Sequence, residues 1–234
     1  MTNEEFYNYL KNDGIVLNEK QKNQFEKYFE ILVEYNKVIN LTAITEKKEV
    51  YLKHFYDSYT LSKTINLLEE NSLCDVGTGA GFPGVVLKIL YPHLNVTLVD
   101  SLNKRVKFLN DLIEKLDLKN IEAIHSRAED FSHKNIEKYD VVTARAVTNL
   151  SNLSEICSQL VKINKYFIPM KGNISQEIKN SEKAIKELGF SFINNYYFEL
   201  PFEKSARNIP VYKKTKKTPK KFPRKFSEIK KNPL

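Results

Sequence analysis

The stretch DVGTGAGFPG, residues 75–84, decides the fold. It holds four of the chain's seven glycines and follows an apolar segment, LCDV at 73–76. Glycine allows the backbone to turn tightly and lets a ligand approach the main chain closely. Pro83 suits the first turn of a helix, where its missing N–H is not needed. The stretch therefore predicts a strand, a ligand-binding loop and a helix N-terminus, in that order.

Beyond residue 72, short apolar runs alternate with amphipathic stretches. The predicted strands are residues 73–76, 96–100, 121–126, 139–144 and 166–170, and the predicted helices are residues 83–91, 103–116, 150–162 and 174–188. Strands and helices alternating at this spacing predict a parallel sheet with right-handed crossovers. Two later extended runs, 190–200 and 208–213, have no helix between them, so we expect them to pair antiparallel at one edge. Pro169 is unusual for a central strand because it lacks an N–H.

The first 70 residues are predicted to be helical. Thr2 and Glu5 form a capping box at the start of a first helix. A second helix begins near Asn18, where apolar residues begin to recur at helical spacing. A third helix is predicted over residues 46–68. Between the second and the third lies YNKVINLT, residues 35–42, whose asparagines predict a loop that hydrogen-bonds its own backbone.

The positive charge is concentrated at the C-terminus. Residues 213–234 carry ten Lys or Arg and one acid, whereas residues 1–212 carry 27 basic and 28 acidic side chains, so the tail accounts for the net charge of +8. Two prolines block a regular helix there, which predicts a flexible segment, and Phe222 and Phe226 lie among the basic residues. This composition suits a polyanion such as RNA, although a solvated end that aids solubility would have it too. We expect a helical extension at 1–70, an α/β domain at 71–213 and a basic tail at 214–234.

Composition excludes several classes of protein. No apolar stretch approaches the roughly 18 residues of a membrane helix, and the acidic N-terminus is unlike a signal peptide. Cys74 and Cys157 are too few for a disulfide framework or a cysteine-built zinc site. We therefore expect a cytoplasmic protein without a metal site or a membrane partner. The nearly neutral body suggests a monomer.

Two ligand classes compete for the glycine loop. GAGFPG at 79–84 matches the dinucleotide pattern G-x-G-x-x-G, and Asp100 lies at a suitable distance to hold a ribose. However, Asp75 at the end of the first strand would repel a pyrophosphate and suits an ammonium group. S-adenosylmethionine carries an amino-acid end, a sulfonium and a ribose but no phosphate. The pair of acids therefore favours a methyltransferase over a dehydrogenase.

Eight motifs resemble one family in order along the whole chain. They are YNKVINLT at 35–42, KHFYDS at 53–58, DVGTGAGFPG at 75–84, VDSLNKRVKFL at 99–109, SRAEDF at 126–131, YDVVTARAV at 139–147, MKG at 170–172 and TPKKFPRK at 218–225. Together they resemble the RsmG or glucose-inhibited division protein B family, the bacterial 16S rRNA guanine-N7 methyltransferases. The resemblance implies a Rossmann-like class I methyltransferase fold. Tyr35 stands where the family often has Trp, and Pro169 interrupts its usual Leu-Lys-Gly approach.

The resemblance also implies which residues bind the cofactor S-adenosylmethionine. Gly77 and Phe82 of the loop are expected to touch it, with Asp100 on the ribose. Further along the chain, Ala128 and Glu129 are expected beside the adenine, and Arg145 at the border of the site. The loop itself adds Asp75 and Gly79. The predicted cofactor-binding set is therefore Asp75, Gly77, Gly79, Phe82, Asp100, Ala128, Glu129 and Arg145. Each of them lies at the carboxyl end of a predicted strand, at the edge where open α/β sheets bind ligands.

The implied substrate is a guanine of 16S rRNA, in the 530-loop region, within the RNA or the small ribosomal subunit. Guanine N7 has a lone pair and no proton, so orientation of the reactants can replace a general base. Arg127, Arg145 and Lys171 are candidates for positioning the RNA, while core packing accounts for His125 and turn roles for Asn164 and Asn173. An RNA-binding protein without catalysis, and methylation of a small molecule or a protein, remain alternatives.

Overall fold

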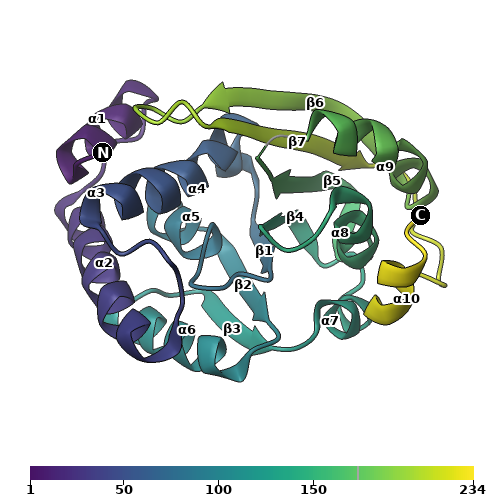
Figure 1. Cartoon of the computed structure of the whole chain (residues 1–234), viewed down its shortest axis with the longest axis horizontal. Helices are drawn as coiled ribbons and strands as arrows, with labels where there is room; N and C mark the ends of the chain where they lie inside the picture. The colour runs from purple at the N-terminus through teal and green to yellow at the C-terminus, as the bar shows by residue number, and fades with distance from the viewer. Residues whose placement is uncertain (173) are drawn as a thin grey trace.

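A seven-stranded sheet forms the centre of the protein in a computed structural model that describes residues 1–172 and 174–234 (Figure 1). Its strands are β1 (Ser72–Val76), β2 (Asn95–Asp100), β3 (Ile121–His125), β4 (Tyr139–Arg145), β5 (Val161–Met170), β6 (Phe190–Glu199) and β7 (Ala206–Lys214). The strand order is β3-β2-β1-β4-β5-β7-β6. Strands β1 to β5 pair in parallel, and β7 pairs antiparallel with both β5 and β6. The predicted mainly parallel sheet with an antiparallel edge is confirmed.

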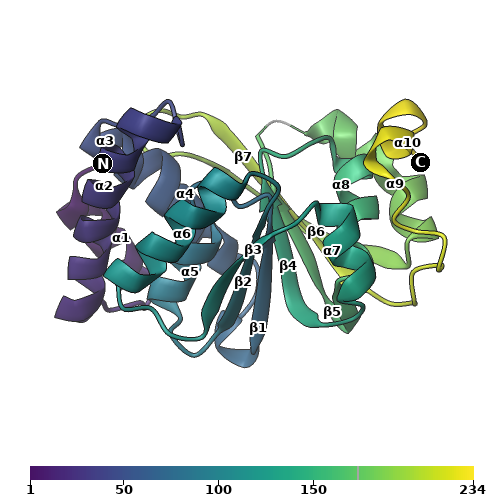
Figure 2. The same cartoon turned by 90° about the horizontal axis from the view of Figure 1, so that it is seen from below.

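Helices cover both faces of the sheet (Figure 2). One face carries α5 (Gly84–Leu90), α6 (Asn103–Lys115) and the N-terminal helices; the other carries α7 (Ala128–Lys134), α8 (Leu150–Cys157), α9 (Ser175–Glu187) and α10 (Phe226–Lys231). Alternation along β1 explains the two layers, because Leu73 joins the core on the first face while Cys74 and Val76 join the core on the second. None of the helices in the described residues is long and apolar enough to span a membrane.

The first two helices begin as the sequence predicts. Thr2 and Glu5 form the capping box of α1 (Asn3–Asn12), and Asn18 caps α2 (Glu19–Ile39). The prediction of a loop over 35–42 was wrong for its first half, because α2 continues to Ile39 and ends at Asn40 in the left-handed region. An asparagine side chain does hydrogen-bond the nearby backbone, as predicted, but the asparagine lies within the helix. The Asn36 side chain accepts from the backbone N–H of Thr42 at 2.8 Å.

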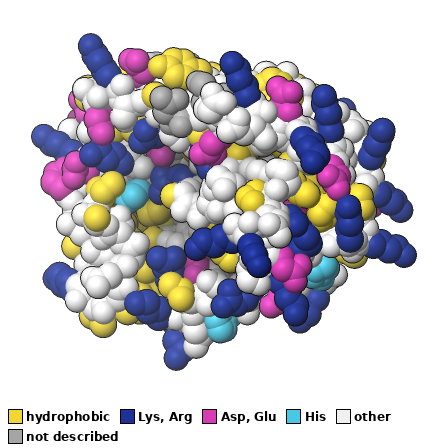
Figure 3. Space-filling view, turned by 45° about the vertical axis from the view of Figure 1, so that its right-hand side comes forward, with side chains coloured by type: hydrophobic (Ala, Val, Ile, Leu, Met, Phe, Trp, Pro, Cys, Tyr) yellow, Lys and Arg dark blue, Asp and Glu magenta, His cyan; other side chains and the backbone are white. Residues whose placement is uncertain are grey.

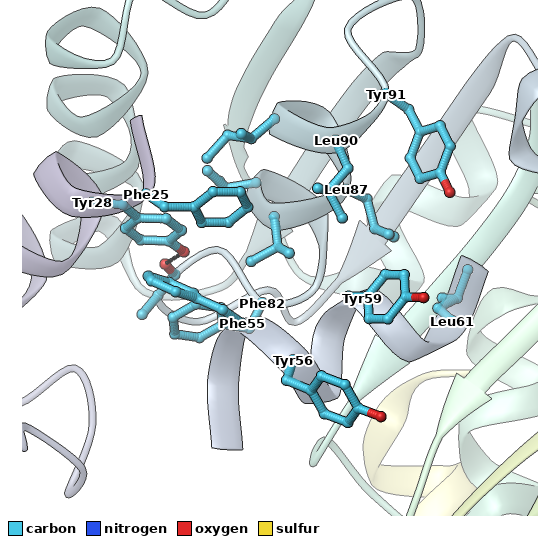
Figure 4. Packing of buried hydrophobic residues seen from close by; sticks show 14 of the residues in the cluster. Phe25, Tyr28, Phe55, Tyr56, Tyr59, Leu61, Phe82, Leu87, Leu90 and Tyr91 are labelled. Carbon is cyan, nitrogen blue, oxygen red and sulfur yellow. Dashed lines mark hydrogen bonds between the residues drawn. The ribbon is translucent and has the colours of Figure 1, made fainter. Parts of the chain in front are cut away.

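The predicted third helix is a run of short helical segments. They are α3 (Lys47–Val50), the π-helical turn η1 (Tyr51–Tyr56), α4 (Asp57–Tyr59) and the 3₁₀ turns η2 (Thr60–Lys63) and η3 (Leu67–Glu69). Aromatic packing accompanies this change of winding: Tyr51, Phe55 and Tyr59 are all buried. Figure 4 shows Phe55 close to Tyr28 and Phe82, with ring centroids 5.2 and 6.1 Å away. Turns of π type are frequent at functional sites.

Two predictions for the C-terminal half of the sheet need correction. No helix was predicted between residues 126 and 139, yet α7 forms there. In addition, α8 ends at Cys157, and β5 begins at Val161 rather than at residue 166. Asn164, within β5, adopts a positive φ of 65°, and Asn173 lies outside the described residues. Pro169 is accommodated opposite Ala144 of β4 without ending the strand.

The prediction of a flexible C-terminal tail was wrong. The segment after β7 packs against α8 and α9, with Phe222 only 1% exposed and Ile229 fully buried. The buried ammonium of Lys214 donates to Ser158 O at 2.6 Å, and Arg224 pairs with Glu155 at 2.6 Å. The prolines do prevent one long helix, but the gain from burying apolar side chains fixes the segment without regular structure.

Candidate active site

The glycine loop follows β1 and enters α5, as predicted. Gly77 has a φ of +70°, and a Cβ there would lie 2.6 Å from the Val147 side chain. Gly84 opens α5, and a Cβ there would lie 2.3 Å from Leu98. Gly79 also has a positive φ, but among the described residues no atom lies within 4 Å of its Cβ position. Close packing therefore requires glycine at 77 and 84, whereas the backbone at Gly79 is open to a ligand.

Asp75 is completely buried beneath this loop. Its Oδ2 accepts from the Thr78 hydroxyl at 2.7 Å and from Gly84 N at 2.8 Å. Its Oδ1 has no hydrogen-bond partner among the residues that the structure describes. Burial raises the pKa of Asp75 to about 6, although bonds from Thr78 and Gly84 oppose the shift. One carboxylate oxygen thus holds the loop, and the other can accept a further donor.

Asp100 ends β2 and lies across from the same loop. Its Oδ2 accepts from Gly79 N at 3.0 Å, and its Oδ1 accepts from Leu102 N at 2.9 Å. Arg105 lies 3.4 Å from Oδ2. Because a carboxylate has about four lone-pair sites, these bonds leave capacity for a ribose hydroxyl. Asp100 therefore both fixes the loop and faces the edge where the cofactor is predicted.

The residues after β3 lie on the outer side of this edge. Ala128 and Glu129 form the first turn of α7, and both are half-buried. Arg127 stands at the N-cap position of that helix, makes no capping bond through its side chain and is exposed. The interpretation of His125 as a core residue was wrong: the side chain is exposed and its Nε2 lies 3.1 Å from Ser101 O. The structure therefore places Arg127 apart from Arg145 and Lys171, which lie at the ends of β4 and β5.

Phe82 connects the glycine loop to the N-terminal helices. Its ring is 5% exposed and stacks on Tyr28 and on His54, with centroids 5.3 and 4.4 Å apart. The Arg145 guanidinium lies over the same ring at 5.2 Å. The Tyr28 hydroxyl donates a hydrogen bond to Ala80 O at 2.6 Å. A ligand would therefore meet the backbone of Phe82 rather than its ring.

Arg145 extends from β4 into a cluster of charged side chains. Its Nη1 donates to Asp57 Oδ2 at 3.0 Å, and Arg207 of β7 donates through Nε to Asp57 Oδ1 at 3.0 Å. These three residues line a cavity of about 350 Å³, together with Lys53 and Lys171. Lys171 pairs with Glu177 at 3.0 Å, and Lys53 pairs with Glu49 at 2.8 Å. The cluster joins the N-terminal helical run to two strands of the sheet.

His54 also lines the cavity, and it is neutral at physiological pH. Burial and then the charge of Arg145 lower the pKa of His54 to about 3. Its Nδ1 lies 3.0 Å from Arg145 Nη2, and its Nε2 lies 2.9 Å from the Thr42 hydroxyl. The same Nδ1 also lies 3.1 Å from the backbone oxygen of Lys53, so both ring nitrogens have polar partners. His54 is thus a fixed wall of the cavity.

Sequence reasoning missed three residues of this cluster, namely His54, Asp57 and Arg207. The motif KHFYDS contained a usable signal, because positions i and i+3 of a helical turn share a face. Arg207 also carried a signal, as a charged residue shortly before the apolar run at residues 209–212. Nothing in the sequence indicated that Asp57 pairs with Arg145 and Arg207, which lie 88 and 150 positions away.

The fold and the loop together define the class of protein. An antiparallel β7 between β5 and β6, with a glycine loop after β1 and an acid ending β2, is the architecture of Rossmann-like class I S-adenosylmethionine-dependent methyltransferases. A dinucleotide-binding fold of the dehydrogenase type has the strand order 3-2-1-4-5-6 instead. The crystal structure of M. jannaschii TYW2 in complex with AdoMet shares this fold, with a TM-score of 0.53 and 12% identity over 67% of this chain and 73% of that one.

Comparison of the sequence narrows the class to one family. The family model of GidB, rRNA small subunit methyltransferase G, matches residues 21–198. The ribosomal RNA small subunit methyltransferase G of Ligilactobacillus salivarius is 52% identical over 240 residues, covering 100% of both chains. The protein of the same name from Bacillus subtilis is 51% identical over 100% of this chain and 99% of its own. The chain belongs to the rRNA small subunit methyltransferase G family.

Proposed function

We propose that this protein transfers a methyl group from S-adenosylmethionine to N7 of a guanine in 16S rRNA, in the 530-loop region. The observation that carries the proposal is identity above 50% along the whole chain to relatives named for small-subunit rRNA methylation. The open glycine loop and its two acids independently support S-adenosylmethionine as the cofactor. In this proposal the protein acts as a cytoplasmic monomer, on free RNA or on the small subunit.

The residues at the loop fit S-adenosylmethionine. Asp75 Oδ1 is a buried acceptor suited to the ammonium group, and Asp100 is an acceptor suited to the ribose hydroxyls. No atom of the described residues lies within 4 Å of a Cβ position at Gly79, which leaves room there for a ligand, while Gly77 allows the loop to pack against Val147. Ala128 and Glu129 would border the adenine, and Arg145 the reacting end. When bound, S-adenosylmethionine supplies an electrophilic methyl group.

The chain's own residues would act by orientation rather than by proton transfer. Guanine N7 carries no proton, and the nearest imidazole of the cavity, His54, is neutral and occupied by Arg145 and Thr42. Holding two reactants in line can contribute about 7–11 kcal/mol to lowering the barrier. The rigid stack of His54, Phe82 and Arg145 is suited to that task, because it joins the glycine loop to the cavity.

A basic surface on the C-terminal segment supports RNA as the partner. Lys and Arg side chains are numerous toward the right of the face in Figure 3, where the C-terminal part of the chain comes forward. The exposed ones in this segment are Lys216, Lys217, Lys220, Lys221, Lys225, Lys230 and Lys231. This segment, which includes α10, packs against α8. Its charges therefore lie on a fixed surface that can follow a phosphate backbone.

Mapping of small-subunit rRNA from cells with and without the protein tests the proposal. Reduction with borohydride followed by aniline cleaves RNA at 7-methylguanine, so each methylated position gives a defined fragment. We expect one fragment to vanish without the protein and to return with the wild-type chain but not with Asp100→Ala. An unchanged fragment pattern, or loss of a methyl group on another atom, would refute the assignment to guanine N7.

A further inference from the structure

The cavity beside the glycine loop has the size and position of a second binding site. Its volume of about 350 Å³ lies within the range of small-molecule sites, roughly 300–1,000 Å³. It lies where β4 and β5 end and where the antiparallel β7 begins, next to the loop that follows β1. Its wall toward that loop is made by His54 and Arg145, and both side chains rest on Phe82. A molecule in the cavity would therefore lie next to the predicted cofactor site.

Stability alone does not explain the charged groups in this cavity. The carboxylate of Asp57 is 7% exposed and is held from both sides, by Arg145 on β4 and Arg207 on β7. Charges are costly to remove from water, and apolar residues of similar volume are often at least as stabilising as a buried ion pair. Three elements distant in sequence thus converge to present one oriented carboxylate at a cavity wall. Such preorganisation is characteristic of ligand recognition.

We propose that this cavity receives the target guanine after it leaves the RNA stack, with Asp57 accepting hydrogen bonds from its N1–H and 2-amino group. The inference rests on the proposed function, because it takes guanine as the substrate base. Guanine has these two donors side by side, with O6 as the next acceptor. A carboxylate matches the two donors, and a guanidinium beside it matches O6. Adenine would instead turn a lone pair on N1 toward the carboxylate.

The other surfaces of the cavity fit a flat, partly apolar ring. Ile44, Met170 and Ile209 offer aliphatic contacts for the faces of the base. Lys53 and Lys171, at the same cavity, suit the phosphates on either side of an extruded nucleotide. As N7 bonds to the methyl group, the purine ring becomes positively charged, and the neighbouring Asp57 carboxylate stabilises that charge.

An inosine substitution in the RNA tests the proposal, because inosine lacks only the 2-amino group of guanine. Small-subunit RNA is assembled from fragments with guanosine or inosine at the methylated position, and single-turnover methylation is followed for each. With the wild-type protein we expect inosine to slow the reaction about tenfold, since a lost pairing leaves the carboxylate unsatisfied. With Asp57→Asn the guanosine reaction slows, and the penalty for inosine shrinks to within about twofold.

The matched control is Glu155→Gln, which also alters a buried carboxylate paired with an arginine, but on the opposite face of the sheet. This variant should keep the wild-type penalty for inosine. The proposal is overturned if Asp57→Asn keeps that penalty in full, or if the wild-type protein methylates both RNAs equally fast. The second comparison needs no variant, so it stands even if Asp57→Asn does not fold. Absence of methylation on the guanosine RNA would instead count against the proposed function.

Discussion

Asp75 and Asp100 end neighbouring strands, yet their carboxylates are used differently. Asp100 bonds Gly79 N and Leu102 N and is expected to take the ribose. Replacing Asp100 with Ala should weaken S-adenosylmethionine binding about 10- to 150-fold, because a hydrogen bond to a charged group contributes about 1.5–3 kcal/mol. Isothermal calorimetry with the purified chain measures this change. A change smaller than twofold would contradict the ribose assignment, and equally strong binding of a nicotinamide dinucleotide would favour the dehydrogenase alternative.

Asp75 should make the stability of the protein depend on pH. Its folded-state pKa of about 6 exceeds that of an unfolded aspartate, so the folded state binds the proton more readily between about pH 4 and 6. The free energy of unfolding therefore falls as pH rises through this interval, by about 2–3 kcal/mol from this group. Asp75→Asn lacks this loss. The free energy of unfolding of the variant minus that of wild type should therefore rise by about 2–3 kcal/mol between pH 4 and pH 7.

Urea unfolding of both proteins at several pH values measures this difference. Comparing the two chains removes the contribution of His54, whose lowered pKa acts in the opposite direction because its folded form sheds the proton. If the free energies of unfolding of the two proteins change with pH in parallel, the pKa of Asp75 is not raised in the folded state and the prediction is wrong. The same variant should bind S-adenosylmethionine more weakly if Oδ1 accepts the ammonium.

At the residue scale, the sequence allowed the strand-end acids and the glycines to be predicted because both have local causes. Asp75, Gly77 and Asp100 follow directly from a strand–loop–helix pattern. The pairing of Arg207 with Asp57 could not be predicted, since the two residues lie 150 positions apart and only the tertiary fold brings them together. Local patterns identify the residues of one turn, whereas the cavity depends on contacts between distant elements.

At the scale of elements, the C-terminal segment should contribute to stability. Phe222 is 1% exposed within the core on the α8 side of the sheet, so Phe222→Ala should destabilise the protein by about 3–5 kcal/mol. Phe226, which is only partly buried, provides the matched control, and Phe226→Ala should cost less than half as much. Chemical denaturation measures both values. Two variants as stable as wild type would indicate a segment that is detached from the core.

Charge and proline content predicted this segment to be flexible, and the reason for the error is physical. Proline excludes a regular helix, but it does not prevent packing of a few apolar residues on a neighbouring core. Similarly, helical periodicity over 46–68 predicted a helix but not the π turn of η1, because tertiary packing of Tyr51 and Phe55 selects the winding. The parallel sheet and the antiparallel edge, by contrast, were predicted from the spacing of the elements.

At the scale of the whole molecule, the basic surface and the cofactor site should be separable. Four exposed lysines of the C-terminal segment are replaced by glutamine: Lys216, Lys217, Lys220 and Lys225. Affinity for small-subunit RNA should fall, and the slope of log affinity against log salt should decrease by up to about 3, since each phosphate contact contributes about 0.7–0.9. S-adenosylmethionine binding should not change, because its predicted contacts lie between Asp75 and Arg145.

A second set with the same change in net charge controls for this experiment. It consists of exposed lysines near the opposite layer of helices, namely Lys11, Lys20, Lys27 and Lys119. These substitutions should leave the salt slope nearly unchanged. If both sets lower the RNA affinity and the salt slope equally, RNA binding depends on net charge alone and the C-terminal surface has no special role.

The central claim is that this chain methylates N7 of a guanine in small-subunit rRNA. The most direct measurement incubates the purified full-length protein with that RNA and methyl-labelled S-adenosylmethionine, digests the RNA to nucleosides and identifies the labelled product by mass spectrometry. We predict that the label is found in 7-methylguanosine and that Asp100→Ala abolishes most of it. Label in any other nucleoside, or unlabelled RNA from a protein that binds both S-adenosylmethionine and the RNA, would contradict the claim.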